Sequence, residues 1–72
     1  MSYITLSKIL GNRILIIRKQ NKLTQEKLAA LSYINIKCLF LIEKGLANPT
    51  VKTLHKISIV LQISLHELFW EL

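Results

Sequence analysis

The chain has 72 residues, of which 51% are hydrophobic, and its formal net charge is +6 at pH 7. Such a length suits one domain with one core, and no linker, repeat or low-complexity tract divides it, so we expect a single domain over residues 1–72. The longest apolar runs, at residues 14–17 and 39–42, are far shorter than the roughly 20 residues that span a bilayer, which argues against a membrane helix. Lys8 and Arg13 interrupt the first apolar stretch, which argues against a secretory signal. We therefore expect a cytoplasmic protein.

The first two predicted helices cover residues 6–20 and 25–31. Residues 21–22 end the first helix. The hydroxyl of Thr24 can cap the second helix, and Glu26 in its first turn interacts favourably with the helix dipole. The apolar residues expected to face the core in these helices are Leu6, Leu10, Ile14, Ile17, Leu28 and Ala29.

The third predicted helix covers residues 36–44. Asn35 can cap its start, and Gly45 ends it because glycine enters the left-handed region without a steric penalty. Leu39 and Ile42 lie three residues apart on one face of this helix, so we expect both to point into the core.

Two further helices are predicted, at residues 51–61 and 65–70. Thr50 offers a cap to the former, and Ser64 with Glu67 has the spacing of a capping box for the latter. No segment alternates with a period of two residues, so we predict an all-α fold of five helices without strands. The residues of the fourth predicted helix that are expected to face the core are Leu54, Ile57 and Leu61, and the fifth predicted helix carries the apolar residues Leu65, Leu68 and Phe69.

Positive charge is concentrated before Gly45. Eight of the ten Lys and Arg residues lie in that part of the chain, where only Glu26 and Glu43 oppose them. A basic half joined to a balanced, apolar half suggests one surface that faces a polyanion and another that associates with a second copy. Ordinary solvated lysines explain the charge equally well.

Several motifs occur in a fixed order along the chain. They are LGNRI at residues 10–14, TQEKLA at 24–29, IEKG at 42–45, NPT at 48–50 and ISLHELF at 63–69. In this order and spacing they resemble the Xre/Cro/phage-repressor helix-turn-helix family over nearly the whole chain. The resemblance implies a compact, five-helix, lambda-repressor-like DNA-binding domain that acts as a transcription regulator, with its helix-turn-helix motif at about residues 24–45.

The third predicted helix has a free face opposite Leu39 and Ile42. Side chains on that face form one outward stripe, which a DNA major groove can receive. In the family, the matching positions read bases. The residues of this stripe are Ile36, Lys37, Phe40, Leu41 and Lys44.

Phosphate contacts are expected beside this stripe. Gln25 lies where free backbone N–H groups and the helix dipole favour an anion, and its amide can bond a phosphate or a base edge. Lys44 and Asn48 match positions that touch the DNA backbone in relatives, and Lys37 can reach a guanine or a phosphate. Exposed polar residues without a partner are the alternative. The predicted DNA-binding residues are Thr24, Gln25, Asn35, Ile36, Lys37, Phe40, Leu41, Lys44 and Asn48.

The resemblance also implies a structural pair. Arg18 and Glu43 match residues that form a partly buried salt bridge between the first and third helices of relatives. Such a bridge orients the recognition helix more than it stabilises the fold, because desolvation offsets much of the attraction.

Two departures from the family pattern affect the interpretation. Tyr33 occupies a turn position where relatives usually have Gly, and a bulky residue at positive φ costs about 1–2 kcal/mol. The outward stripe contains Ile36, Phe40 and Leu41 where relatives mostly carry polar residues. Apolar side chains can contact thymine methyl groups, which favours an A·T-rich operator. The competing interpretation is a protein-docking surface, such as that of an antitoxin or an adaptor.

More apolar residues are present than one small core absorbs, and many lie near the C-terminus. We predict a homodimer through residues 59–72, with Trp70 as a buried anchor. In the alternative, Trp70 only covers the first helix of its own chain. The predicted interface residues are Ile59, Val60, Ile63, Leu65, Phe69, Trp70 and Leu72.

The sequence shows no pattern of catalytic or metal-binding residues. His55 and His66 have no second cysteine or acidic cluster nearby, and Cys38 lacks a neighbouring base. We therefore expect a protein that is not an enzyme, with no cofactor, no metal and no evident small-molecule ligand, and with double-stranded DNA as its partner. Small members of the resembled family include controller proteins of restriction-modification systems and phage or plasmid repressors, and such a regulator is expected to control its own gene.

Overall fold

The computed structural model describes residues 3–70 of the chain. Within them the fold consists of α1 (Tyr3–Gln20), α2 (Gln25–Ser32), α3 (Ile36–Glu43), α4 (Val51–Leu61) and α5 (Leu65–Leu68), and contains no strand. The predicted all-α, five-helix fold is confirmed. Helix α1 begins earlier than predicted, which fits the absence of glycine and proline before Gly11, and α5 ends two residues earlier than predicted.

Side-chain caps define where four of the helices begin. Thr24 Oγ1 accepts a hydrogen bond from the Lys27 N–H at 3.0 Å, and the other three caps are made in the same way by Asn35, Thr50 and Ser64. Each cap satisfies a backbone donor that has no partner within the helix and contributes about 1 kcal/mol. The helix starts were therefore predictable from local chemistry.

Helix ends in this chain use the left-handed backbone region without glycine in three places. Lys22 follows α1, Tyr33 follows α2 and Gln62 follows α4, with φ values of 57°, 57° and 60°. Gly45, after α3, has a φ of 75°. The unfavourable conformation expected at Tyr33 is thus present, and two other residues share it.

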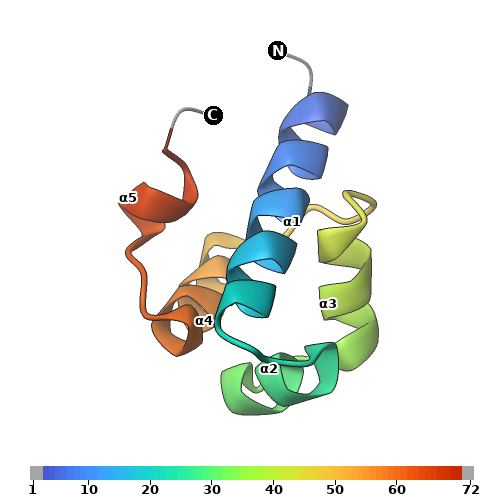
Figure 1. Cartoon of the computed structure of the whole chain (residues 1–72). Helices are drawn as coiled ribbons and strands as arrows, with labels where there is room; N and C mark the ends of the chain where they lie inside the picture. Colours follow the sequence, from blue (N-terminus) through green and yellow to red (C-terminus); the bar gives the residue numbers. More distant parts are fainter. Residues whose placement is uncertain (1–2, 71–72) are drawn as a thin grey trace.

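Helix α1 lies alongside α3 on one side and α5 on the other, with α2 crossing at its lower end (Figure 1). The buried apolar residues form one core to which every helix contributes. No helix within residues 3–70 is both long enough and apolar enough to cross a membrane. The core residues are Leu10, Ile14, Leu28, Ala29, Leu39, Ile42, Leu54, Ile57, Leu61 and Leu68.

Two residues expected to face the core, Leu6 and Ile17, are less buried than predicted, and two apolar residues of the C-terminal segment share their surroundings. Leu6 and Phe69 are 37% and 38% exposed and line a groove beside Pro49 and Val51. Ile17 and Leu65 are half-buried at the edge of the core. Helical periodicity identifies the inward face of a helix, but it does not show where along that face the neighbouring helices stop covering it.

Candidate nucleic-acid interface

Helices α2 and α3 are joined by a three-residue turn and pack against each other through buried side chains. Leu28 and Ala29 of α2, with Leu39 and Ile42 of α3, are almost completely buried. The small side chain of Ala29 lies in the buried layer, as expected for two closely crossing helices. This packing leaves the opposite face of α3 open to solvent.

The open face of α3 carries the predicted stripe. Ile36 and Phe40 are 43% and 44% exposed, and Lys37 and Lys44 are exposed as well. Leu41 is half-buried and lies at the edge of the stripe. The result is a mixed apolar and cationic surface on one helix face.

Phe40 and Lys44 form one unit within this stripe. The Lys44 ammonium lies 5.5 Å from the centre of the Phe40 ring, over its face. A cation over an aromatic face is attracted by the ring quadrupole, by about 0.5–1 kcal/mol at an exposed site. The contact holds the positive charge at the C-terminal end of the stripe.

The start of α2 is organised by Thr24 and Gln25. Thr24 is exposed, and its oxygen is used as the cap of α2. Gln25 is half-buried, and its Nε2 donates a hydrogen bond to Glu43 Oε1 at 2.9 Å. The sequence predicted a free amide at Gln25 and missed this bond, because the partner lies 18 residues away at the end of another helix.

Asn35 and Asn48 differ in how the fold uses them. The Asn35 Oδ1 accepts a hydrogen bond from the Lys37 N–H at 2.7 Å and caps α3. Asn48 is exposed in the loop that follows α3. Asn35 directly precedes α3 and Asn48 lies in the loop after it, so the two residues flank the helix that carries the stripe.

The ion pair between Arg18 and Glu43 is present and deeply placed. Arg18 Nε lies 2.7 Å from Glu43 Oε2, and Arg18 Nη2 lies 3.0 Å from Oε1, which makes the pair bidentate. The two side chains are only 9% and 2% exposed. Arg18 Nη1 also donates to the Leu23 carbonyl at 2.8 Å, so one guanidinium ties α1 to α3 and to the turn before α2.

Basic residues before Gly45 divide into internal and exposed groups. Arg13 donates from Nη1 to the carbonyl oxygens of Leu68 and Trp70, so its charge serves the packing of α1 against α5. Arg18 is paired with Glu43 in the buried salt bridge. The remaining basic residues of this part of the chain are exposed lysines, namely Lys8, Lys19, Lys22, Lys27, Lys37 and Lys44.

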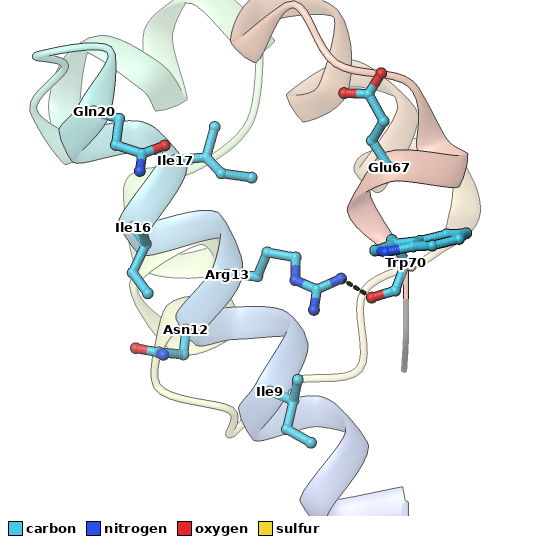
Figure 2. Close-up of a pocket in the computed structure, with 8 residues that line it drawn as sticks. All are labelled: Ile9, Asn12, Arg13, Ile16, Ile17, Gln20, Glu67 and Trp70. Carbon is cyan, nitrogen blue, oxygen red and sulfur yellow. Dashed lines mark hydrogen bonds between the residues drawn. The ribbon is translucent and has the colours of Figure 1, made fainter.

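The residues predicted to form a dimer interface do not line one groove. Trp70, 57% exposed, forms a wall of a groove of about 490 Å³ between α1 and α5, opposite Ile16 and Ile17 (Figure 2). Ile59 and Val60 line a separate groove between α4 and the end of α2.

The other predicted interface residues are placed differently again. Phe69 lines the groove that includes Leu6 and Val51. Ile63 and Leu65 are half-buried against the core, and Leu72 lies outside the described residues. The apolar surface of the C-terminal half is therefore divided over several faces.

Two helices joined by a short turn, with the outward face of the second left free and its ends flanked by polar and cationic side chains, define a helix-turn-helix DNA-binding domain. The family model described as Helix-turn-helix matches residues 14–68. The chain therefore belongs to the Xre-type helix-turn-helix family, a class of DNA-binding transcription regulators.

A solved structure has a similar fold. It is the clp gene regulator ClgR from Corynebacterium glutamicum, which superimposes with a TM-score of 0.84 at 22% sequence identity, over 88% of this chain and 67% of that chain. No protein of curated function matches this chain in sequence. At this level of identity the likeness concerns the fold.

Proposed function

We propose that the chain is a sequence-specific regulator that binds an inverted-repeat operator as a homodimer and controls its own gene. The observation that carries the proposal is the exposed stripe on α3, where Ile36, Lys37 and Phe40 face solvent. A major groove is wide enough to receive an α-helix, and the edge of each base pair presents a distinct pattern there.

Each stripe residue has a role that its chemistry supports. Lys37 donates to guanine acceptors or to a phosphate. Ile36 and Phe40 contact thymine methyl groups, and the half-buried Leu41 adds apolar surface at the edge. The preferred half-site therefore contains A·T pairs opposite the apolar residues of α3.

The phosphate contacts surround the stripe. Lys44 supplies charge at one end of α3, and Asn48 supplies an amide from the following loop. Thr24 and Asn35 use an oxygen for capping, yet the Thr24 hydroxyl hydrogen and the Asn35 amide N–H groups stay available as donors. Gln25 adds an amide donor at the start of α2. These contacts position α3 without reading sequence.

Dimerisation supplies the second half-site. We infer that the interface lies in the segment 59–72 and is anchored by Trp70, which is 57% exposed. Two subunits related by a two-fold axis put their α3 helices in successive major grooves, roughly 34 Å apart. The operator lies at the chain's own promoter, as expected for the small regulators that the sequence resembles.

Selection of bound duplexes from a random DNA pool, followed by a salt titration with the selected duplex, tests the proposal. We expect an A·T-containing inverted repeat, with affinity that falls steeply as the salt concentration rises, because phosphate contacts release counterions. Equal, weak binding to every duplex would contradict sequence-specific regulation.

A second candidate function is a protein-interaction module that uses α3. The observation in its favour is the pair of apolar side chains Ile36 and Phe40, each more than two-fifths exposed on one helix face. Exposed apolar surface of this kind often marks a protein contact. If DNA selection yields no enriched sequence while Phe40→Ala abolishes capture of a protein partner, this second function replaces the first.

A further inference from the structure

We propose that Glu43 is a positioning residue for DNA binding, which acts through Gln25: it holds the Gln25 amide so that one N–H group faces a DNA phosphate. This inference rests on the proposed function and adds a role to Glu43 beyond its salt bridge. Glu43 is the last residue of α3, and Gln25 is the first residue of α2.

The Glu43 carboxylate receives hydrogen bonds from two different side chains. Arg18 donates from Nε to Oε2 at 2.7 Å and from Nη2 to Oε1 at 3.0 Å. Gln25 Nε2 donates to the same Oε1 at 2.9 Å. With only 2% of its side chain exposed, Glu43 is fixed by α1, and it in turn fixes the amide of Gln25.

The chemistry of a carboxylate determines which way the amide points. An ionised carboxylate accepts hydrogen bonds and cannot donate them, so Gln25 must turn its nitrogen, not its oxygen, toward Glu43. That nitrogen has two hydrogens, and Glu43 takes one. Within residues 5–70 the second N–H of Gln25 forms no hydrogen bond, and the side chain is half-exposed at the start of α2.

Charge balance explains why a carboxylate is tolerated so near the proposed phosphate site. A lone negative charge there would repel DNA, but the bidentate guanidinium of Arg18 neutralises it. Arg18 is itself held by the Leu23 carbonyl at 2.8 Å, in the turn that leads into α2. The network therefore presents a fixed, neutral donor to the phosphate at low conformational cost.

The test is a double-mutant cycle on binding to a mixed-sequence duplex of about 20 base pairs, which reports phosphate contacts without knowledge of the operator. The variants are Gln25→Ala, Glu43→Gln and the pair, with circular dichroism used to choose a temperature at which all are folded. Each single change is expected to weaken binding about 3- to 10-fold, and the pair no more than the stronger single change. Gln25→Ala is expected to leave the salt slope unchanged, because a neutral amide releases no counterion from the phosphate that it contacts.

Other results overturn the inference. If Glu43→Gln weakens binding as much in the Gln25→Ala background as alone, Glu43 acts only through the fold. Should Gln25→Ala bind like the unchanged chain, the amide touches no phosphate. Absence of any salt-dependent binding by the unchanged chain removes the proposed function and this inference together.

A second variant covers the case in which Glu43→Gln does not fold. Gln25→Asn keeps the amide but shortens the side chain by one methylene, so the amide no longer reaches Glu43, while the buried ion pair is untouched. We expect binding as weak as that of Gln25→Ala. Binding equal to that of the unchanged chain would show that the bond to Glu43 does not position the amide.

Discussion

Gly11 of α1 lies directly against the carbonyl oxygen of Ile42 in α3: a β-carbon at Gly11 would lie 2.1 Å from that oxygen. The neighbouring obstacle is backbone, which cannot move aside as a flexible side chain can. The two helices carry the ends of the Arg18–Glu43 pair, so their separation also determines where α3 sits relative to the rest of the domain.

Gly11→Ala is therefore expected to lower the free energy of unfolding by about 2 kcal/mol, although alanine is the better helix former. Urea denaturation followed by circular dichroism measures this difference. Asn12→Ala, one residue along and exposed, is the matched control and should change stability little. A gain in stability for Gly11→Ala would contradict the close contact between α1 and α3.

Tyr33→Gly is expected to stabilise the fold by about 1 kcal/mol. Tyr33 has a φ of 57°, which costs roughly 1–2 kcal/mol for a residue with a β-carbon. Glycine removes this cost, but it loses more conformational entropy on folding, which offsets part of the gain in stability. The residue is 88% exposed, so little packing is lost. Tyr33→Ala keeps the β-carbon and serves as the control without a gain. A lower melting temperature for Tyr33→Gly would show that the ring makes a stabilising contact.

Glu43→Ala is expected to reduce stability by about 3 kcal/mol, because it leaves the buried guanidinium of Arg18 without its partner. DNA affinity should fall as well, since α3 loses its connection to α1. Chemical denaturation and binding are measured on the same samples. In the double variant Arg18→Met with Glu43→Met much of the stability should return, because neither charge is then buried alone. Unchanged stability of Glu43→Ala would remove any stabilising role for the pair.

How far the sequence predicts this structure depends on the range of the interaction. The helix starts follow from Thr24, Thr50 and Ser64, because capping joins groups only a few residues apart. The contact of Gly11 with Ile42 and the bond of Gln25 to another helix were missed, because both depend on how the helices cross. Sequence motifs flagged these positions through family resemblance, but the physical reason for each residue type became visible only in three dimensions.

The predicted interface illustrates the same limit on a surface. The sequence shows that there are more apolar residues than one small core absorbs, but it does not show which of them lie together on one face. Ile59, Phe69 and Trp70 line separate grooves, because the turn at Gln62 and the short α5 direct neighbouring segments to different faces. Periodicity within one helix does not determine which faces of two helices coincide.

Phe40→Ala is expected to remove a preference for thymine in the selected operator. In the unchanged protein, replacing the contacted thymine by deoxyuridine, which lacks the methyl group, should weaken binding by about 3- to 10-fold. In Phe40→Ala the same replacement should have no further effect. Competition binding with the two duplexes measures the difference. An equal penalty in both proteins would place the methyl contact elsewhere.

Lys44→Ala is expected to weaken binding to every duplex by a similar factor and to lower the salt slope by about 0.9, since a phosphate contact carries no sequence information. Affinities for the operator and for an unrelated duplex are measured over a range of salt concentrations. Lys56→Ala, which removes the same charge from α4, is the matched control. Loss of discrimination between the two duplexes would instead assign Lys44 to base recognition.

Trp70→Ala separates a dimer contact from packing within one chain. If Trp70 is the anchor of a homodimer, sedimentation equilibrium should show a monomer under conditions where the unchanged chain is dimeric, and affinity for the inverted repeat should drop while affinity for a single half-site stays the same. If Trp70 only covers α1, stability should fall even at dilutions where the unchanged chain is monomeric. The former result is expected, because Trp70 is 57% exposed in the single chain and this aromatic surface can become buried against a partner.

Ile59→Ala, which changes a residue of a different groove, is the control. An equal loss of dimer in Ile59→Ala would move the interface to the face between α2 and α4.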